Sequence, residues 1–187
     1  MAVMTDVVRT DRLLLKPYVR EDEESFVRLF QDEEVVRYVG DGLQTEAADR
    51  ALFHRVLTDV YPTRRFDVWA VWLDGAHVGH AELKPCSRAE GHELIYALAR
   101  AVWGRGLGRE LVGGLLRQAF AVRRLPELHA TVDVLNTRSL VVLAAAGFEA
   151  VRDFTEEGGG ITRLLTVRRG RIPEQAPPED APLPAGP

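Results

Sequence analysis

Apolar residues recur every three or four positions in several stretches of the chain, which is typical of amphipathic helices. In the first stretch, Phe26, Leu29 and Phe30 share one face of a helix over 21–30. The same spacing predicts further helices over 45–61, 106–122 and 137–146. Thr45 opens the second of these, where a threonine hydroxyl can cap the helix N-terminus. We therefore expect about four helices.

Other stretches alternate apolar and polar residues or stay apolar for a few positions, as strands do. They lie at 12–17, 66–83, 93–99, 128–135 and 161–168. Asp74-Gly75 divides the second stretch into two strands, because this dipeptide tolerates the positive φ angles of a type I′ hairpin turn. Strands outnumber helices and the early strands are linked by a hairpin, so the sequence predicts an α/β domain with a mixed sheet.

Composition narrows the class of protein. The chain has 187 residues, of which 46% are apolar and 28% charged, and this excludes collagen-like, coiled-coil and wholly disordered chains. A net charge of -4 with scattered arginines disfavours a nucleic-acid partner. Charges interrupt the N-terminal region, and no window is apolar enough to span a membrane, so we expect a cytoplasmic protein without membrane contact. Cys86 is alone and cannot form an internal disulfide.

Proline divides the chain into two parts. Six of the ten prolines fall within 172–187. Because proline fixes φ and lacks an N–H donor, we expect one domain over 1–170 and a Pro-rich C-terminal tail over 171–187. The tail is either a dispensable terminus or a segment that binds a second subunit, which leaves a homodimer open.

Glycines cluster where a predicted strand gives way to a helix. The run is Trp103-Gly104-Arg105-Gly106-Leu107-Gly108-Arg109. Without Cβ atoms, main-chain N–H groups can approach and point at one anion, and the helix dipole adds about half a positive charge there. Arg105 or Arg109 can add a full charge. The Walker pattern is absent and the third glycine of the dinucleotide fingerprint falls on Arg109, so the loop predicts a phosphate site of another kind, with tight packing as the alternative.

Around this loop the chain resembles the GNAT superfamily of N-acetyltransferases, and within it the RimJ/RimL-like group of ribosomal-protein N-terminal acetyltransferases. The resemblance covers about 9–169 and rests on four segments in order, which are 12–17, 93–98, 103–110 and 136–148. It implies a GNAT fold, with a twisted, mostly antiparallel sheet of about seven strands, about four flanking helices, and splayed fourth and fifth strands. It also implies that acetyl-CoA is the co-substrate and that acetyl moves to a primary amine by direct attack in a ternary complex.

The resemblance further implies where the ligands lie. The coenzyme contacts that it implies are Leu98, Ala99, Val102, Trp103, Gly104, Arg105, Gly106, Leu107, Gly108, Arg109 and Asn136. Amides near Leu98 and Ala99 can bind the developing oxyanion. The acceptor, a protein N-terminus or a small amine, is placed between 31 and 44, together with the turn after Ala150. The competing hypothesis is a non-catalytic sensor that binds acyl-CoA on the same fold.

Two residues are catalytic candidates. Glu93 precedes the glycine loop, and a water chain from its carboxylate can take the amine proton; the alternative is a solvated acid at a strand edge. The resemblance implies that Ser139 faces the coenzyme sulfur, while plain capping by Asn136 is the alternative. Many relatives carry a tyrosine acid four residues before the Gly-Phe pair, where this chain has Leu143, so Tyr96 is held in reserve.

The histidines and the glutamate between residues 77 and 82 do not predict a metal site. His77, His80 and Glu82 are close in sequence, but residues 77 and 80 of a regular strand point to opposite faces. We therefore expect no metal. Trp69 and Trp72 also face opposite sides, so one of them can line the acceptor cleft.

Overall fold

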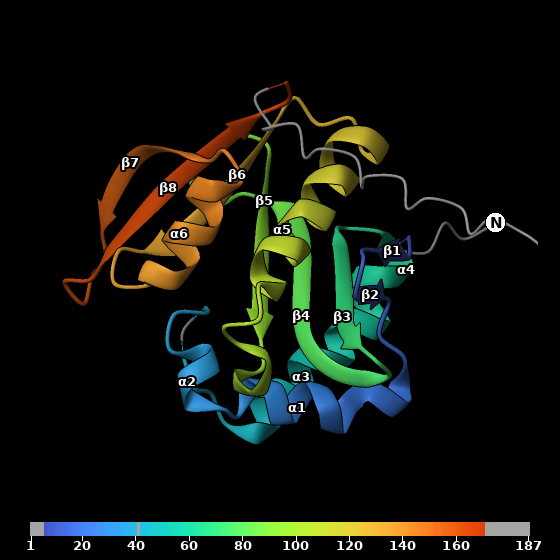
Figure 1. Cartoon of the computed structure of the whole chain (residues 1–187). Coiled ribbons are helices and arrows are strands. Elements are labelled where there is room, and N and C mark those ends of the chain that lie inside the picture. Colours follow the sequence, from blue (N-terminus) through green and yellow to red (C-terminus); the bar gives the residue numbers. More distant parts are fainter. Residues whose placement is uncertain (1–5, 41, 171–187) are drawn as a thin grey trace, which may run out of the picture.

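Eight strands form one twisted sheet in the part of the chain that the structure describes, which is residues 6–40 and 42–170 of a computed structural model (Figure 1). Their order is β1-β2-β3-β4-β5-β6-β8-β7, and every neighbouring pair is antiparallel except β5 with β6. The strands are β1 (Val8–Arg9), β2 (Leu13–Lys16), β3 (Asp67–Leu73), β4 (Ala76–Pro85), β5 (His92–Leu98), β6 (Glu127–Asp133), β7 (Glu149–Thr155) and β8 (Ile161–Arg168). The mixed, mostly antiparallel sheet is confirmed, whereas the tail over 171–187 lies outside the described residues.

Helices cover both faces of this sheet. They are α1 (Glu23–Phe30), α2 (Glu33–Val36), α3 (Glu46–Arg55), α4 (Tyr61–Thr63), α5 (Leu107–Arg117) and α6 (Thr137–Ala145), with 3₁₀ turns at Arg20–Asp22 and Arg100–Val102. The helices expected over 45–61 and 106–122 each continue beyond their α-helical part as a π turn, at Val56–Val60 and Gln118–Val122. The four long helices expected from the sequence are therefore confirmed.

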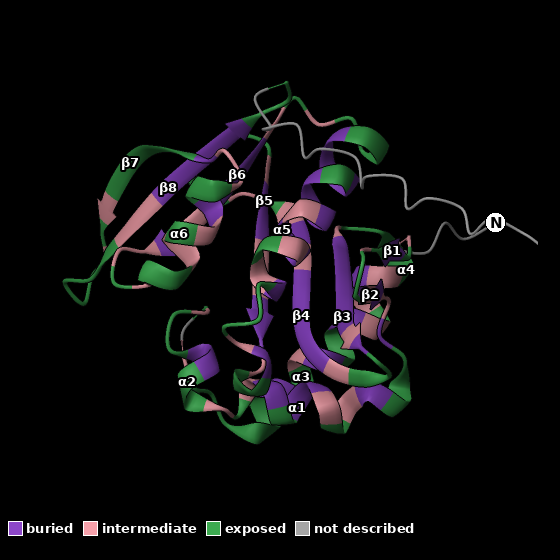
Figure 2. Cartoon of the chain, in the orientation of Figure 1, coloured by how far each residue is buried: buried purple, intermediate pink, exposed green. Residues whose placement is uncertain are grey.

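Two large groups of buried side chains hold the helices to the sheet. One lies on the face covered by α5 and α6 and includes Trp69, Leu111 and Leu143. The other lies on the face covered by α1 and α3 and includes Phe26 and Phe53. Figure 2 shows the result, since β3 is buried along most of its length and β4 along its middle, whereas β7 is largely exposed.

The short helix α2 is held by a small group of its own. This group consists of Leu29 from α1, Val35 from α2 and Ala97 from β5. None of these three residues belongs to either large group, but the partly buried Phe30 and Trp103 pack against this group and also against the large ones, so α2 joins the domain through a small set of buried and half-buried contacts.

The turn and cap signals read from the sequence are confirmed. Asp74 and Gly75 have φ angles of 49° and 81°, as a type I′ turn requires. Gly147 has a φ of 90° after α6, and Phe148 behind it is buried. Thr45 caps α3 with its side-chain oxygen.

Three elements escape the sequence pattern, namely β1, α2 and β7. β1 has two residues and α2 has four, which is too short for a period to appear. In β7 nearly every side chain is exposed, so one face is not marked by apolar residues. The expectation of a turn after Ala150 is wrong, because Ala150 lies inside β7.

A bulge in β4 changes which side chains share a face. The register between β3 and β4 shifts at Val78, which has no partner on β3. His77 and His80 consequently lie on the same face, with ring nitrogens 3.3 and 3.1 Å from Tyr18 Oη. The expectation that these histidines point to opposite faces is therefore wrong.

β5 and β6 are register neighbours at one point only. They run parallel, and their single register pair joins Glu93 to His129. Beyond this pair β5 continues to Leu98 without a β6 partner. β5 and β6 are the strands that the resemblance numbers fourth and fifth, so the expected splay is confirmed.

Candidate active site

A cleft of about 980 Å³ lies where β5 and β6 separate. Its wall combines α2, the C-terminal half of β5, the loop that leads to α5, and the first turns of α5 and α6. Three of these segments contribute Val35 from α2, Tyr96 from β5 and Ser139 from α6. The splay thus brings together side chains from distant parts of the sequence.

The glycine loop presents unpaired main-chain N–H groups. Gly104 and Gly106 have φ angles of 74° and 76°, which residues with a Cβ rarely adopt. Among the described residues, the N–H groups of 104–109 find no acceptor, and the first paired one is that of Glu110, 3.3 Å from the Gly106 oxygen. Such groups at a helix N-terminus attract anions. The loop therefore fits the diphosphate of a coenzyme.

The cleft gathers most of the residues expected to hold the coenzyme. Those that line it are Leu98, Val102, Trp103, Gly104, Gly106, Leu107, Gly108, Arg109 and Asn136. Ala99 instead packs beside the small group that holds α2. Arg105 also lies outside the lining, and its carbonyl oxygen accepts a hydrogen bond from Arg12 at 3.1 Å. Contact of these residues with the coenzyme stays a prediction.

Two hydroxyl groups meet in the cleft wall. Tyr96 Oη and Ser139 Oγ are 2.8 Å apart, which joins β5 to the first turn of α6. Burial raises the pKa of Tyr96, although the hydrogen bond with Ser139 opposes this, so the phenol stays protonated at neutral pH. Asn136 Oδ1 accepts a hydrogen bond from the Ser139 N–H at 3.2 Å. Asn136 therefore caps α6 through the Ser139 main chain, which leaves the Ser139 hydroxyl free for Tyr96.

Glu93 is buried beside the point where β5 and β6 meet. Its side chain accepts a hydrogen bond from Thr131 Oγ1 at 3.1 Å, and Cys86 Sγ lies 3.8 Å from the same oxygen. The residue is 5% exposed, so it is not a solvated acid at a strand edge. It is not among the residues that line the cleft. Its place as general base stays a prediction.

Sequence reasoning missed a cation in the cleft wall. The Arg138 guanidinium carbon lies 4.5 Å from the centre of the Trp103 ring, and both residues line the cleft with Arg109. Arg138 falls in the segment 136–148 that carries the resemblance, but nothing in the sequence shows that it stacks on a residue of the glycine loop.

The tryptophans of the hairpin lie away from this site. Trp69 belongs to the buried group under α5 and α6, and Trp72 packs beside the group under α1 and α3, so they face opposite sides as expected. Neither is among the side chains that line the cleft.

Comparison with known proteins identifies the family. The model of the acetyltransferase (GNAT) domain matches residues 12–149. This chain belongs to the GNAT family of acetyltransferases. The family takes its acetyl group from acetyl-CoA, so the chain is an acetyl-CoA-dependent acetyltransferase.

Individual relatives resemble this GNAT domain over most of its length. An uncharacterized N-acetyltransferase p20 of Bacillus licheniformis is 25% identical over 169 residues, covering 87% of this chain and 93% of that protein. The structure of Mycobacterium smegmatis RimJ in complex with CoA-disulfide has a TM-score of 0.78 at 19% identity, and the match covers 91% of this chain and 90% of that chain. Spermidine N-acetyltransferase from Vibrio cholerae, in complex with CoA and spermine, has a TM-score of 0.73 at 17% identity. The match covers 86% of this chain and 97% of that chain. These structures share the fold with this chain.

The described part of the GNAT domain holds neither a helix that could cross a membrane nor a cluster of metal ligands. None of its described helices is both long and apolar enough to cross a membrane. No set of three or more His, Cys, Asp or Glu side chains within 6–40 and 42–170 is arranged to hold a metal ion.

Proposed function

We propose that this domain transfers acetyl from acetyl-CoA to a primary amine, by direct attack of the amine within a ternary complex in the cleft between β5 and β6. The observation that carries this proposal is the composition of one cleft wall. This wall holds the unpaired N–H groups of Gly104 and of residues 106–109, together with the hydroxyl pair of Tyr96 and Ser139. The first can bind a diphosphate, and the second can donate a proton to a leaving thiolate.

The hydroxyl pair can act as the proton donor. If Tyr96 Oη donates to Ser139 Oγ, the Ser139 hydrogen is left to point at the sulfur. The amine nitrogen then forms a bond to the thioester carbonyl carbon and gives up one proton through water to Glu93, the carbon–sulfur bond breaks, and the thiolate takes the Ser139 proton. Tyr96 returns a proton to Ser139, and solvent restores Tyr96. The raised pKa of Tyr96 supports this order, because a buried phenol keeps its proton at neutral pH.

Direct attack is supported by the position of the cysteine. Cys86 is the only cysteine in the sequence and does not line the cleft. Burial also raises the pKa of its thiol, which disfavours the nucleophilic thiolate. The acetyl group therefore passes to the amine without an acetyl-cysteine.

The acceptor amine enters along α2. Glu34 lines both the main cleft and a second hollow of about 550 Å³, whose wall also contains Asp32 and Glu33. Asp32 pairs with Arg100 at 2.8 Å and Glu34 pairs with Arg37, so among the described residues of this wall Glu33 is the carboxylate left without an ion pair. A carboxylate at an entrance raises the local concentration of a cationic amine. This wall lies within the segment 31–44 expected to meet the acceptor.

A panel of amines tests the proposed function. Purified protein is mixed with acetyl-CoA and with peptides bearing free N-termini, polyamines and small primary amines, and release of free thiol is measured. We expect thiol release with at least one of these classes and none with N-acetylated controls. Tight binding of acetyl-CoA without release on any amine would instead support the acyl-CoA sensor.

Replacing Glu93 by Gln tests its place as the base. The amide keeps an oxygen that can accept from Thr131, so we expect the fold to survive. We expect kcat at saturating substrates to fall about 100-fold, which is within the range of general base catalysis. Glu82→Gln is the matched control, because Glu82 is a carboxylate on β4 held by His80 at 2.9 Å. Normal kcat in Glu93→Gln would remove Glu93 from the role.

A further inference from the structure

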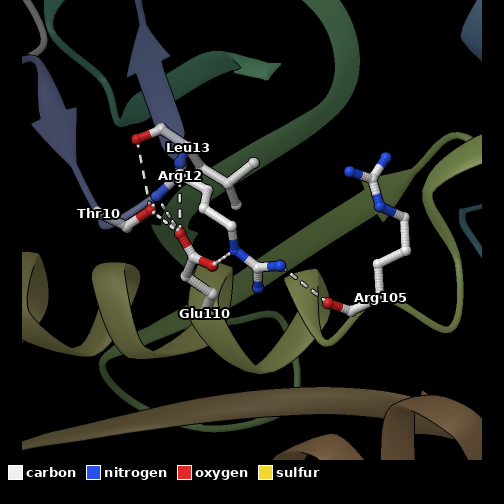
Figure 3. Close-up of polar contacts among 5 residues, drawn as sticks. All are labelled: Thr10, Arg12, Leu13, Arg105 and Glu110. Carbon is white, nitrogen blue, oxygen red and sulfur yellow. Dashed lines mark hydrogen bonds and ion pairs between the residues drawn. The ribbon is translucent and has the colours of Figure 1, made fainter. Parts of the chain in front are cut away.

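One carboxylate ties the turn between β1 and β2 to the first turn of α5. Both oxygens of Glu110 accept hydrogen bonds from this turn (Figure 3). The donors are Thr10 Oγ1 at 2.5 Å, the Arg12 N–H at 2.7 Å, Arg12 Nε at 2.7 Å and the Leu13 N–H at 3.3 Å. The Glu110 side chain is 13% exposed, so the carboxylate is shielded from water and held by the turn.

Arg12 reaches from this carboxylate to the glycine loop. Its Nη1 donates to the Arg105 carbonyl oxygen at 3.1 Å (Figure 3). Its Nη2 lies 3.8 Å from the place that a Cβ on Gly106 would take. We call the connected residues the Arg12 clasp, and they are Thr10, Arg12, Leu13, Arg105 and Glu110.

The bond to Arg105 determines where the next N–H group points. In a trans peptide the C=O and the following N–H point in opposite directions, and the peptide between Arg105 and Gly106 is trans. Because the Arg105 oxygen is turned toward Arg12, the Gly106 N–H points away from Arg12. Gly106 lines the cleft and Arg12 does not. The clasp thus holds one of the unpaired N–H groups in a defined direction.

The clasp also neutralises the negative charge of Glu110 at this helix end. A bare carboxylate in the first turn of α5 would repel an anion bound at the same N-terminus. Burial works against ionisation of Glu110, but the hydrogen bonds from Thr10 and Arg12 outweigh it and hold the pKa of Glu110 below its usual range. The Arg12 guanidinium offsets the resulting negative charge. The helix end therefore keeps its positive character.

We propose that Arg12 and Glu110 are positioning residues for the diphosphate of acetyl-CoA, and that they act through the peptide between Arg105 and Gly106. This rests on the proposed function, because it assigns the diphosphate to the glycine loop. Neither residue touches the coenzyme. Glu110 orients Arg12, Arg12 orients the Arg105 carbonyl, and the Gly106 N–H faces the diphosphate as a result.

Calorimetry with coenzyme A and with its phosphoadenosine diphosphate half tests the proposal on the full chain. In Arg12→Met we expect the Kd for both ligands to rise about tenfold. In nuclear magnetic resonance spectra of the wild type, we expect the Gly106 amide proton to move downfield when the phosphoadenosine diphosphate half binds. A smaller displacement of this signal is expected in the variant. A purely structural tie would lower the melting temperature without changing this signal.

The matched control is Arg117→Met. Arg117 also ties α5 to the N-terminal strands, since its Nη2 donates to the Arg9 carbonyl oxygen at 3.5 Å, but it lies at the other end of the helix. We expect this variant to bind both ligands as the wild type does. Equal losses in Arg117→Met and Arg12→Met would overturn the proposal.

Glu110→Gln provides a second route if Arg12→Met does not fold. The amide keeps an acceptor oxygen for the turn but removes the ion pair, and we expect a Kd several times that of the wild type. Wild-type affinity in a folded Arg12→Met or Glu110→Gln variant overturns the clasp alone. A wild-type protein that does not bind coenzyme A overturns the proposed function, and the clasp proposal with it.

Discussion

Gly106→Val is expected to bind coenzyme A about 100-fold more weakly than the wild type, equivalent to about 2.8 kcal/mol. Gly106 has a φ of 76°, a conformation in which a β-branched residue is strained by about 1–3 kcal/mol. Relief of this strain turns the peptide and its N–H away from the diphosphate site. The Cβ of a residue at 106 also lies 3.8 Å from Arg12 Nη2, so the larger valine side chain crowds the Arg12 clasp that orients this peptide. Titration calorimetry with coenzyme A measures the change.

Gly159→Val separates backbone strain from ligand binding. Gly159 has a φ of 81° in the turn between β7 and β8, and an added Cβ there meets nothing within 4 Å. We expect this variant to lose stability as Gly106→Val does, because the strain is of the same kind, but to keep the wild-type affinity for coenzyme A. Wild-type affinity in Gly106→Val would show that the phosphates lie elsewhere.

Ser139→Ala and Tyr96→Phe are each expected to lower kcat about 100-fold, and the double variant little further. A proton donor contributes at least this much to catalysis, and residues that act as one unit show losses that do not add. Steady-state kinetics at saturating acetyl-CoA and amine measure kcat, and calorimetry with coenzyme A measures affinity, which we expect to stay near the wild-type value.

Asn136→Ala distinguishes catalysis from helix capping. Its side chain accepts from the Ser139 N–H, so we expect a loss of about 1 kcal/mol in the free energy of unfolding. Ser139→Ala keeps that N–H and therefore the cap, and loses the hydrogen bond with Tyr96 instead. If Ser139→Ala has normal kcat and Tyr96→Phe does not, Tyr96 alone is the donor; normal kcat in both variants contradicts the hydroxyl pair.

Features that depend on a few consecutive residues could be predicted from the sequence. Asp74-Gly75 tolerates the positive φ angles that a type I′ turn requires, and a glycine such as Gly147 favours the end of a helix. Residue type alone therefore predicts the turn and the helix end. The bulge at Val78 could not be, because pairing with β3 decides it. The exposed strand β7 carries no apolar period, since neither of its faces is deeply buried.

The same distinction applies to the active site. The glycine loop is one continuous run, so anion binding by this loop can be predicted from its glycines and the helix behind it. The pair of Tyr96 and Ser139 joins residues 43 positions apart, and Arg12 reaches Glu110 across 98 positions. Such pairs depend on how β5, α6 and the first strands meet in space. The burial of Glu93 likewise follows from the junction with β6.

The separate attachment of α2 has a consequence for how such a domain can evolve. The wall proposed to meet the acceptor packs on Leu29, Val35 and Ala97, whereas the glycine loop proposed to bind the coenzyme is joined to the large buried group under α5 and α6. Substitutions along α2 can therefore alter which nitrogen compounds are admitted without endangering the grip on the shared donor. Related domains can thus differ in substrate while the side proposed to bind the coenzyme stays the same.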